Sequence, residues 1–112
     1  MPRNISFFMT QAQIKAREKT VTRRFAWYKL KPGDVLNGVK KSQGLKKGEK
    51  IERLCQIEII SARVEPLDAI TQADVIAEGF PDWTPAQFVD LIVGHYKCER
   101  DAPINRIEFK YI

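Results

Sequence analysis

The chain has 112 residues, 44% of them hydrophobic, which is enough for the core of one compact domain and leaves no room for a second. No apolar run approaches the length of a membrane-spanning helix, and the N-terminus has no signal-peptide core, so we expect one cytoplasmic domain over residues 1–112. Cys55 and Cys98 are too few for a disulfide framework and are expected to be small, reduced core residues.

The net charge of +5 is unevenly distributed. Residues 15–50 hold 12 of the 19 lysines and arginines and only three acids, which puts this window at +9 and the rest at −4. Such asymmetry steers a polyanion to one side of a molecule, which favours RNA or DNA over a membrane as partner. Five lysines surround Gly44 and Gly48, in a pattern typical of a solvated loop that would contact only backbone phosphate. They are Lys40, Lys41, Lys46, Lys47 and Lys50.

The first half of the chain predicts two strands, a helix and a turn. A short apolar run predicts a strand at residues 5–8, and a series of good helix formers predicts a helix from about residue 10 to 18. Residues 31–34 (KPGD) form a turn, because proline fixes one backbone dihedral angle and glycine permits the next. A strand is expected to follow over residues 35–39.

The second half predicts a long strand, two helices and a final strand. Residues 51–64 approximate the alternation of a strand with one buried face, and Pro66 ends it. Thr71 is expected to cap a helix that ends at Gly79, with Glu78 in its last turn. Residues 84–87 (TPAQ) have the form of a capping box with proline at the first helical position, which predicts a helix through residue 96. Its core face would comprise Phe88, Leu91, Ile92 and Tyr96.

The C-terminal segment alternates apolar and charged residues, which predicts a strand. Its inward set is Ile107, Phe109 and Tyr111, and its outward set is Arg106, Glu108 and Lys110. Strands at both ends of the chain with helices between them predict an α+β fold built on a mixed barrel or sheet.

Residues 17–24 (REKTVTRR) place four cations and two hydroxyls in eight residues, a composition suited to an anion. The threonines and valine favour extended backbone, so the segment is expected to be a strand or a loop at a strand edge. The alternative is a solvated basic edge that discourages aggregation. Trp27 follows closely enough to stack on a base, but an aromatic residue beside a strand also suits a core.

These segments resemble the ASCH domains of the PUA-like superfamily, small β-barrels associated with RNA. The resemblance covers nearly the whole chain and rests on residues 19–24 (KTVTRR), 30–36 (LKPGDVL), 67–71 (LDAIT), 78–80 (EGF) and 107–109 (IEF). The family usually has glycine two residues before the lysine, where this chain has Arg17. The fold implied is a small PUA-like mixed β-barrel with two or three short helices.

One branch of this family deacylates N4-acetylcytidine with a lysine, a threonine and a glutamate, and the matching positions are Lys19, Thr22 and Glu78. The resemblance makes Thr22 the nucleophile, Lys19 its activator and Glu78 a proton-transfer or orienting group. Lys19 and Thr22 are an odd number of residues apart and would face opposite sides of a regular strand, so a shared site requires a turn or bulge between them. If the three residues are not catalytic, Lys19 is expected to bind phosphate, Thr22 to favour the strand conformation, and Glu78 to pair with an arginine of the basic segment.

The sequence thus predicts a basic cleft that receives a nucleotide or modified nucleoside in RNA. Arg17, Arg23, Arg24 and Trp27 are the candidate binding residues. The alternatives are an amidohydrolase acting on free acetylated cytidine and, ranked last, a ribonuclease, for which only His95 offers an imidazole base. His95 and Cys98 have a helical spacing seen in metal sites, but the chain supplies too few further ligands for zinc, so we expect no metal and no cofactor.

Overall fold

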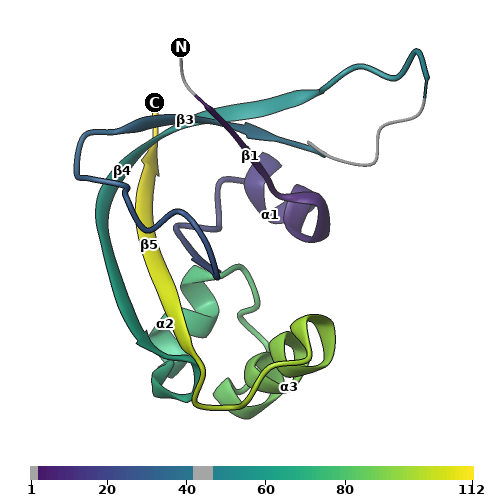
Figure 1. Cartoon of the computed structure of the whole chain (residues 1–112). Coiled ribbons are helices and arrows are strands. Elements are labelled where there is room, and N and C mark those ends of the chain that lie inside the picture. The colour runs from purple at the N-terminus through teal and green to yellow at the C-terminus, as the bar shows by residue number, and fades with distance from the viewer. Residues whose placement is uncertain (1–2, 42–46) are drawn as a thin grey trace.

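The computed structural model describes residues 3–41 and 47–112, and the predicted loop residues Gly44 and Lys46 lie outside them. Five strands form one sheet in the order β1-β3-β4-β5-β2. They are β1 (Arg3–Ser6), β2 (Val21–Arg24), β3 (Val35–Val39), β4 (Arg53–Pro66) and β5 (Pro103–Tyr111). The β1–β3 pair is parallel and the other pairs are antiparallel, which confirms a mixed sheet. The sheet curls into a half-barrel around the long strands β4 and β5 (Figure 1).

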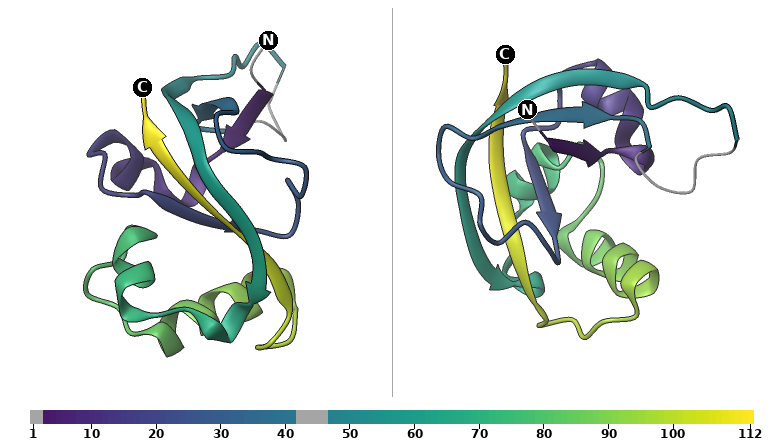
Figure 2. Two further views of the ribbon diagram at one scale, coloured as in Figure 1. Left: turned by 90° about the vertical axis from the view of Figure 1, so that its left-hand side faces the viewer. Right: turned by 45° about the horizontal axis from the view of Figure 1, so that its top comes forward.

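Three short α-helices pack beside this curved sheet, as Figures 1 and 2 show. They are α1 (Gln11–Lys15), α2 (Gln72–Ala77) and α3 (Pro85–Tyr96), and two 3-10 turns, η1 (Phe8–Thr10) and η2 (Leu67–Ala69), precede α1 and α2. The α+β prediction is therefore confirmed. No helix in the described part of the chain is both long and apolar enough to cross a membrane.

The capping predictions are confirmed in detail. Thr71 accepts a hydrogen bond from the Asp74 amide at the start of α2, and Thr84 and Gln87 form a reciprocal capping box at the start of α3. The turn at residues 31–34 and the strand at residues 35–39 also lie where the sequence places them. Local side-chain chemistry decides these boundaries, which is why they are readable without the fold.

The N-terminal segment differs from its prediction. The strand covers residues 3–6, Phe8 belongs to η1, and the helix ends at residue 15 instead of 18. Arg17 has a φ of 58°, in the left-handed region, so the helix cannot continue through it. Glycine adopts this conformation without strain, so the backbone here suits the glycine that the resemblance led us to expect in place of Arg17.

Two hydrophobic clusters hold the domain together. The sheet cluster packs the concave side of the strands against α1, and the helix cluster packs α2 and α3 against η2 and the start of β5. The buried residues of the sheet cluster are Ile5, Phe7, Ile14, Leu30, Leu36, Cys55, Ile57, Ile59, Ile107 and Phe109. Those of the helix cluster are Leu67, Ile70, Val75, Phe88, Val89, Ile92 and Ile104. Both cysteines are free thiols, Cys55 buried and Cys98 half-buried.

Candidate functional site

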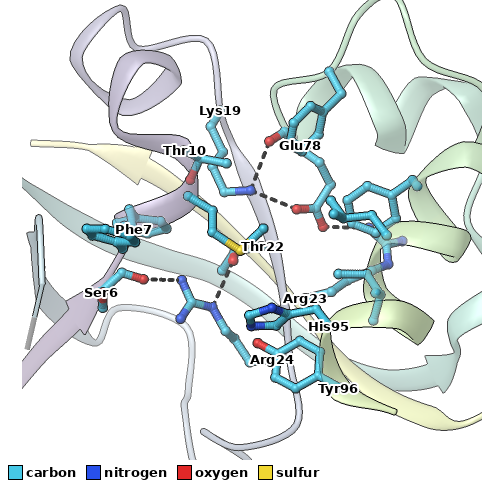
Figure 3. A pocket seen from close by; sticks show the side chains of 16 residues that line it. Ser6, Phe7, Thr10, Lys19, Thr22, Arg23, Arg24, Glu78, His95 and Tyr96 are labelled. Carbon is cyan, nitrogen blue, oxygen red and sulfur yellow. Dashed lines mark hydrogen bonds and ion pairs between the residues drawn. The ribbon is translucent and has the colours of Figure 1, made fainter. Parts of the chain in front are cut away.

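A cavity of about 250 Å³ lies where the two clusters meet. Phe7 of the sheet cluster forms one side, and Phe88 and Ile92 of the helix cluster form another. Its polar groups come mainly from the basic segment and from the end of α2 (Figure 3). They include Lys19, Thr22, Arg23, Arg24 and Glu78. The structure thus brings together all three residues that the sequence nominated for catalysis and two of the four nominated for binding.

Lys19 and Glu78 form a buried ion pair, although 59 residues separate them in the chain. The Lys19 ammonium donates to Glu78 Oε1 at 2.7 Å and to the Glu78 backbone carbonyl at 2.9 Å. The segment before β2 is tied to the end of α2, because the Thr20 amide donates to the Ala77 carbonyl at 2.8 Å. This backbone bond sets the neighbouring residues Lys19 and Glu78 face to face.

Gly79 makes the approach of these segments feasible. Its φ of 101° lies in the left-handed region, and a Cβ built there would lie 2.6 Å from the Gln13 side chain of α1. A larger residue would therefore be strained in backbone conformation and would also push α1 away. The predicted glycine cap of α2 is confirmed, and the structure adds this close contact as a second reason for it.

Lys19 and Thr22 both line the cavity because Lys19 is not part of the strand. β2 begins at Val21, and the irregular segment before it replaces the turn or bulge that a shared site requires. Within β2, Thr22 and Arg24 lie on one face, and the Arg24 Nε donates to Thr22 Oγ1 at 3.0 Å. In Figure 3, Thr22 lies between the Lys19–Glu78 pair and Arg24.

Arg23 pairs with Glu78, which confirms the alternative expected for Glu78, and it also joins a wider network of carboxylates that the sequence did not predict. Its Nη1 donates to Glu78 Oε2 at 3.0 Å, and its Nη2 contacts Asp74 at 2.6 Å and Glu65 at 3.4 Å. Arg106 completes the network with a two-point contact to Asp74, at 2.8 and 3.0 Å. Arg106 lies on the face of β5 opposite to Ile107, as the alternation predicted, but that face is not open here, because α2 covers this end of the sheet and Asp74 pairs with Arg106.

Burial sets the protonation behaviour of the site. Desolvation lowers the pKa of Lys19, and the nearby Arg24 and Arg23 lower it further, while Glu78 acts in the opposite direction. Hydrogen bonds from Arg106 are the main reason that the pKa of Asp74 is far below its usual value. The arginines on the Arg23 side thus keep Asp74 ionised, and burial at the cavity makes the ammonium of Lys19 easier to deprotonate.

Arg17 and Trp27 are not among the residues that line the cavity. The Arg17 guanidinium lies over the Tyr111 ring at 4.9 Å, and Arg3 lies over the Trp27 ring at 4.6 Å. Trp27 packs against the sheet cluster, in accordance with its core alternative. Arg17 therefore does not narrow the cavity.

Sequence reasoning missed much of the cavity wall. Phe8 and Met9 of η1 are both more than half exposed, and Tyr96, which was expected in the core, is 44% exposed at the other side. His95 lies beside it. Phe80, which belongs to the motif that the sequence had singled out, also lines the cavity, with the centre of the tilted Trp83 ring 4.7 Å from its own. The apolar spacing of α3 indicated a buried face but contained no sign that its last turn borders a cavity.

The described residues include no cluster of three or more His, Cys, Asp or Glu suited to a metal ion.

Comparison with solved structures places the fold. An ASCH domain from Lactobacillus crispatus JV V101 superposes with a TM-score of 0.70 at 17% identity, covering 97% of this chain and 78% of the other. The chain has the ASCH-domain fold. A DUF984 protein from Enterococcus faecalis V583 has the same fold, with a TM-score of 0.68 at 16% identity over 100% of this chain and 77% of the other. The hypothetical protein PH0355 gives 0.65 at 15% identity, over 99% and 97% of the two chains.

The ASCH-domain fold is therefore conserved at identities where sequence comparison fails. No protein-family model and no curated protein sequence matches this chain. The small α+β fold that the sequence motifs predicted is confirmed. The motif residues 19–24 and 78–80 meet at the cavity of this fold.

Proposed function

We propose that the cavity binds one nucleoside or nucleotide, either free or as a modified base turned out of an RNA strand. The observation that carries the proposal is the convergence of Lys19, Thr22 and Glu78 on one cavity of about 250 Å³ with apolar walls. Pockets for small ligands combine apolar walls with a few placed polar groups, and a flipped-out base is recognised by such groups and by stacking.

The polar groups have hydrogen-bonding capacity to spare. The Lys19 ammonium uses two contacts on Glu78, which leaves one of its three donors for a ligand. The Glu78 carboxylate accepts one bond at each oxygen and has further lone pairs for an exocyclic amine. Thr22 Oγ1 accepts from Arg24, so its own proton remains available to a base edge. These groups suit a cytosine-like ring with adjacent donor and acceptor atoms.

Titration calorimetry with cytidine and N4-acetylcytidine tests this binding function. We expect Thr22→Val to weaken the binding of at least one of them by about tenfold, because it removes a hydroxyl and keeps the shape of the side chain. Thr20→Val is the matched control, since Thr20 is in the same segment and is not among the cavity-lining residues. Absence of binding by the wild-type protein, or equal effects of both variants, would contradict the proposal.

A second candidate function is hydrolysis of an N-acyl group on the exocyclic nitrogen. It is favoured by a specific observation, the buried Lys19 whose pKa is lowered beside the hydroxyl-bearing Thr22. A neutral Lys19 would accept the hydroxyl proton of Thr22 while the Thr22 Oγ forms a bond to the acyl carbon of the substrate. The carbon–nitrogen bond then breaks, and Lys19 returns the proton to the leaving amine.

Water completes this reaction by attacking the Thr22 ester, with Lys19 moving the proton from water to the Thr22 oxygen. The products are the free amine and the carboxylic acid, so one water is consumed for each amide. Glu78 would position Lys19 and accept a hydrogen bond from the substrate nitrogen. Lys19→Met, Thr22→Val and Glu78→Gln should each reduce cytidine release from N4-acetylcytidine at least a hundredfold, and Thr20→Val should not.

The pH dependence separates this mechanism from simple binding. If Lys19 acts as the base, kcat/KM must rise with pH, since deprotonation creates the active form, and the rise must be centred below the ordinary lysine pKa of 10.5 because burial lowers it. A protein that binds N4-acetylcytidine and releases no cytidine at any pH would leave binding as the function and exclude hydrolysis of this substrate.

A further inference from the structure

The three cations that line the cavity differ in how their charges are neutralised. Lys19 pairs with Glu78, and Arg23 pairs with Glu78, Asp74 and Glu65. Within the described ranges, no carboxylate forms an ion pair with Arg24. Arg24 is the exception in an otherwise paired site.

The charges of the whole cluster lead to the same conclusion. The buried and half-buried members are Lys19, Arg23, Arg24 and Arg106, with four positive charges, and Glu65, Asp74 and Glu78, with three negative ones. Arg63 also contacts Glu65, but its side chain is 61% exposed and its charge remains in water. One positive charge is left over, and it belongs to the arginine that faces the cavity. Removing a charge from water is costly unless an opposite charge compensates for it.

Arg24 is held in place by neutral groups. Its Nη2 donates to the Ser6 carbonyl at 2.6 Å, its Nε donates to Thr22 Oγ1, and its guanidinium lies 5.2 Å from the centre of the Phe7 ring. These contacts use two of its five N–H donors, so three remain for a ligand. Burial lowers the pKa of Arg24, and the charges of Tyr96 and Glu78 offset this only in part. These contacts fix the orientation of the Arg24 side chain, but none of them brings a negative charge to its guanidinium.

We propose that the ligand of this cavity carries an anionic group that binds to Arg24. The inference rests on the proposed function in that it takes a nucleoside as the rest of the ligand. Two sources supply such a group, a phosphate on the ribose or a carboxylate at the end of an acyl chain on the base. A guanidinium binds either with paired hydrogen bonds. In both cases the anionic group of the ligand would neutralise the positive charge of Arg24, which has no carboxylate partner among the described residues.

Titration calorimetry with three probes tests the proposal. Cytidine is neutral, cytidine 5′-monophosphate carries the phosphate, and N4-succinylcytidine carries the carboxylate. We expect one of the two anionic probes to bind about 10- to 100-fold more tightly than cytidine, the range for a hydrogen bond between charged groups. The tighter of the two identifies the source of the charge. Equal affinities for all three probes, or a preference for cytidine, would overturn the proposal.

Charge variants assign the effect to Arg24. Arg24→Gln should abolish the preference for the anionic probe, and Arg24→Lys should keep part of it because the charge remains. Lys110→Gln is the matched control, since it removes the same charge from a side chain that is 58% exposed on the solvent side. If Arg24→Gln and Lys110→Gln reduce the preference equally, long-range attraction explains it and the Arg24 site is excluded. If Arg24→Gln does not fold, the comparison of Arg24→Lys with wild type decides.

A measurement without any nucleoside separates this inference from the proposed function. Inorganic phosphate should raise the melting temperature of the wild-type protein more than chloride at equal ionic strength, because it binds the folded state. Arg24→Gln should lose this difference. Failure of all three nucleoside probes would overturn the proposed function, whereas absence of phosphate protection in the wild type would overturn the anion site at Arg24.

Discussion

Arg23 and Arg24 are adjacent in sequence and lie in opposite environments. Both border the cavity, but the side chain of Arg23 is fully buried among three carboxylates, whereas Arg24 donates to neutral oxygens. The period of two in a strand sends neighbouring side chains to opposite faces, and here α2 supplies acids to only one of those faces. A run of like charges therefore contains one cation that holds the fold together and one that is available to a ligand.

The largest loss of stability is expected from a change at Arg23, whose charge is neutralised by three carboxylates. Arg23→Gln would leave three carboxylates without their shared cation and should lower the free energy of unfolding by about 3–5 kcal/mol, the cost of breaking a buried charge network. Urea denaturation followed by circular dichroism measures this change. Arg100→Gln is the control, since its pair with Asp90 is exposed and should contribute no more than about 1 kcal/mol. Equal losses in both variants would contradict the comparison.

A smaller loss is expected from Lys19→Met. Glu78 keeps its contact with Arg23, and the variant no longer buries an ammonium group, so we expect a loss of about 1–2 kcal/mol. The same denaturation experiment measures it. A loss larger than that of Arg23→Gln would mean that Lys19, and not Arg23, is the principal partner of Glu78.

Acid sensitivity sharpens the comparison further. The pKa of Asp74 is lowered by Arg106 and Arg23, so between its folded and unfolded values the unfolded state binds more protons. Its stabilisation is therefore complete above the ordinary value of 3.8 and is lost as the pH falls below it. The slope from one proton is at most about 1.4 kcal/mol per pH unit. Asp74→Asn should lower stability at neutral pH and flatten this part of the profile, and an unchanged slope would exclude Asp74 as its source.

The smallest effect is expected from Arg24→Gln. The variant loses two hydrogen bonds to neutral oxygens and also removes an uncompensated charge, so the free energy of unfolding should change by no more than about 1 kcal/mol. Denaturation in phosphate-free buffer measures this change without the contribution of a bound anion. A loss as large as that of Arg23→Gln would show that Arg24 is structural, and its role in binding would need another basis.

Much of the fold was predictable because it depends on local chemistry. The caps at Thr71 and Thr84, the turn at Pro32 and Gly33, and the buried face of β4 follow from which backbone groups a side chain can satisfy and which dihedral angles it allows. The end of the first helix was not predictable, since the left-handed conformation of Arg17 is not favoured by its own residue type.

The sequence by itself determined most of the elements after the N-terminal segment, and its motifs singled out Lys19, Thr22 and Glu78 as candidate site residues. Only the tertiary structure decided that these residues share one cavity, that Arg17 and Trp27 lie away from it, and that Arg106 is buried. The physical reason is that a charged group is neutralised by the opposite charges nearest to it in the folded protein, and these can be far from it in the sequence. Arg23 and Arg24 look equivalent in the chain. They differ because the carboxylates that neutralise Arg23 come from β4, 42 residues further along, and from α2 and the turn after it, 51 and 55 residues further along.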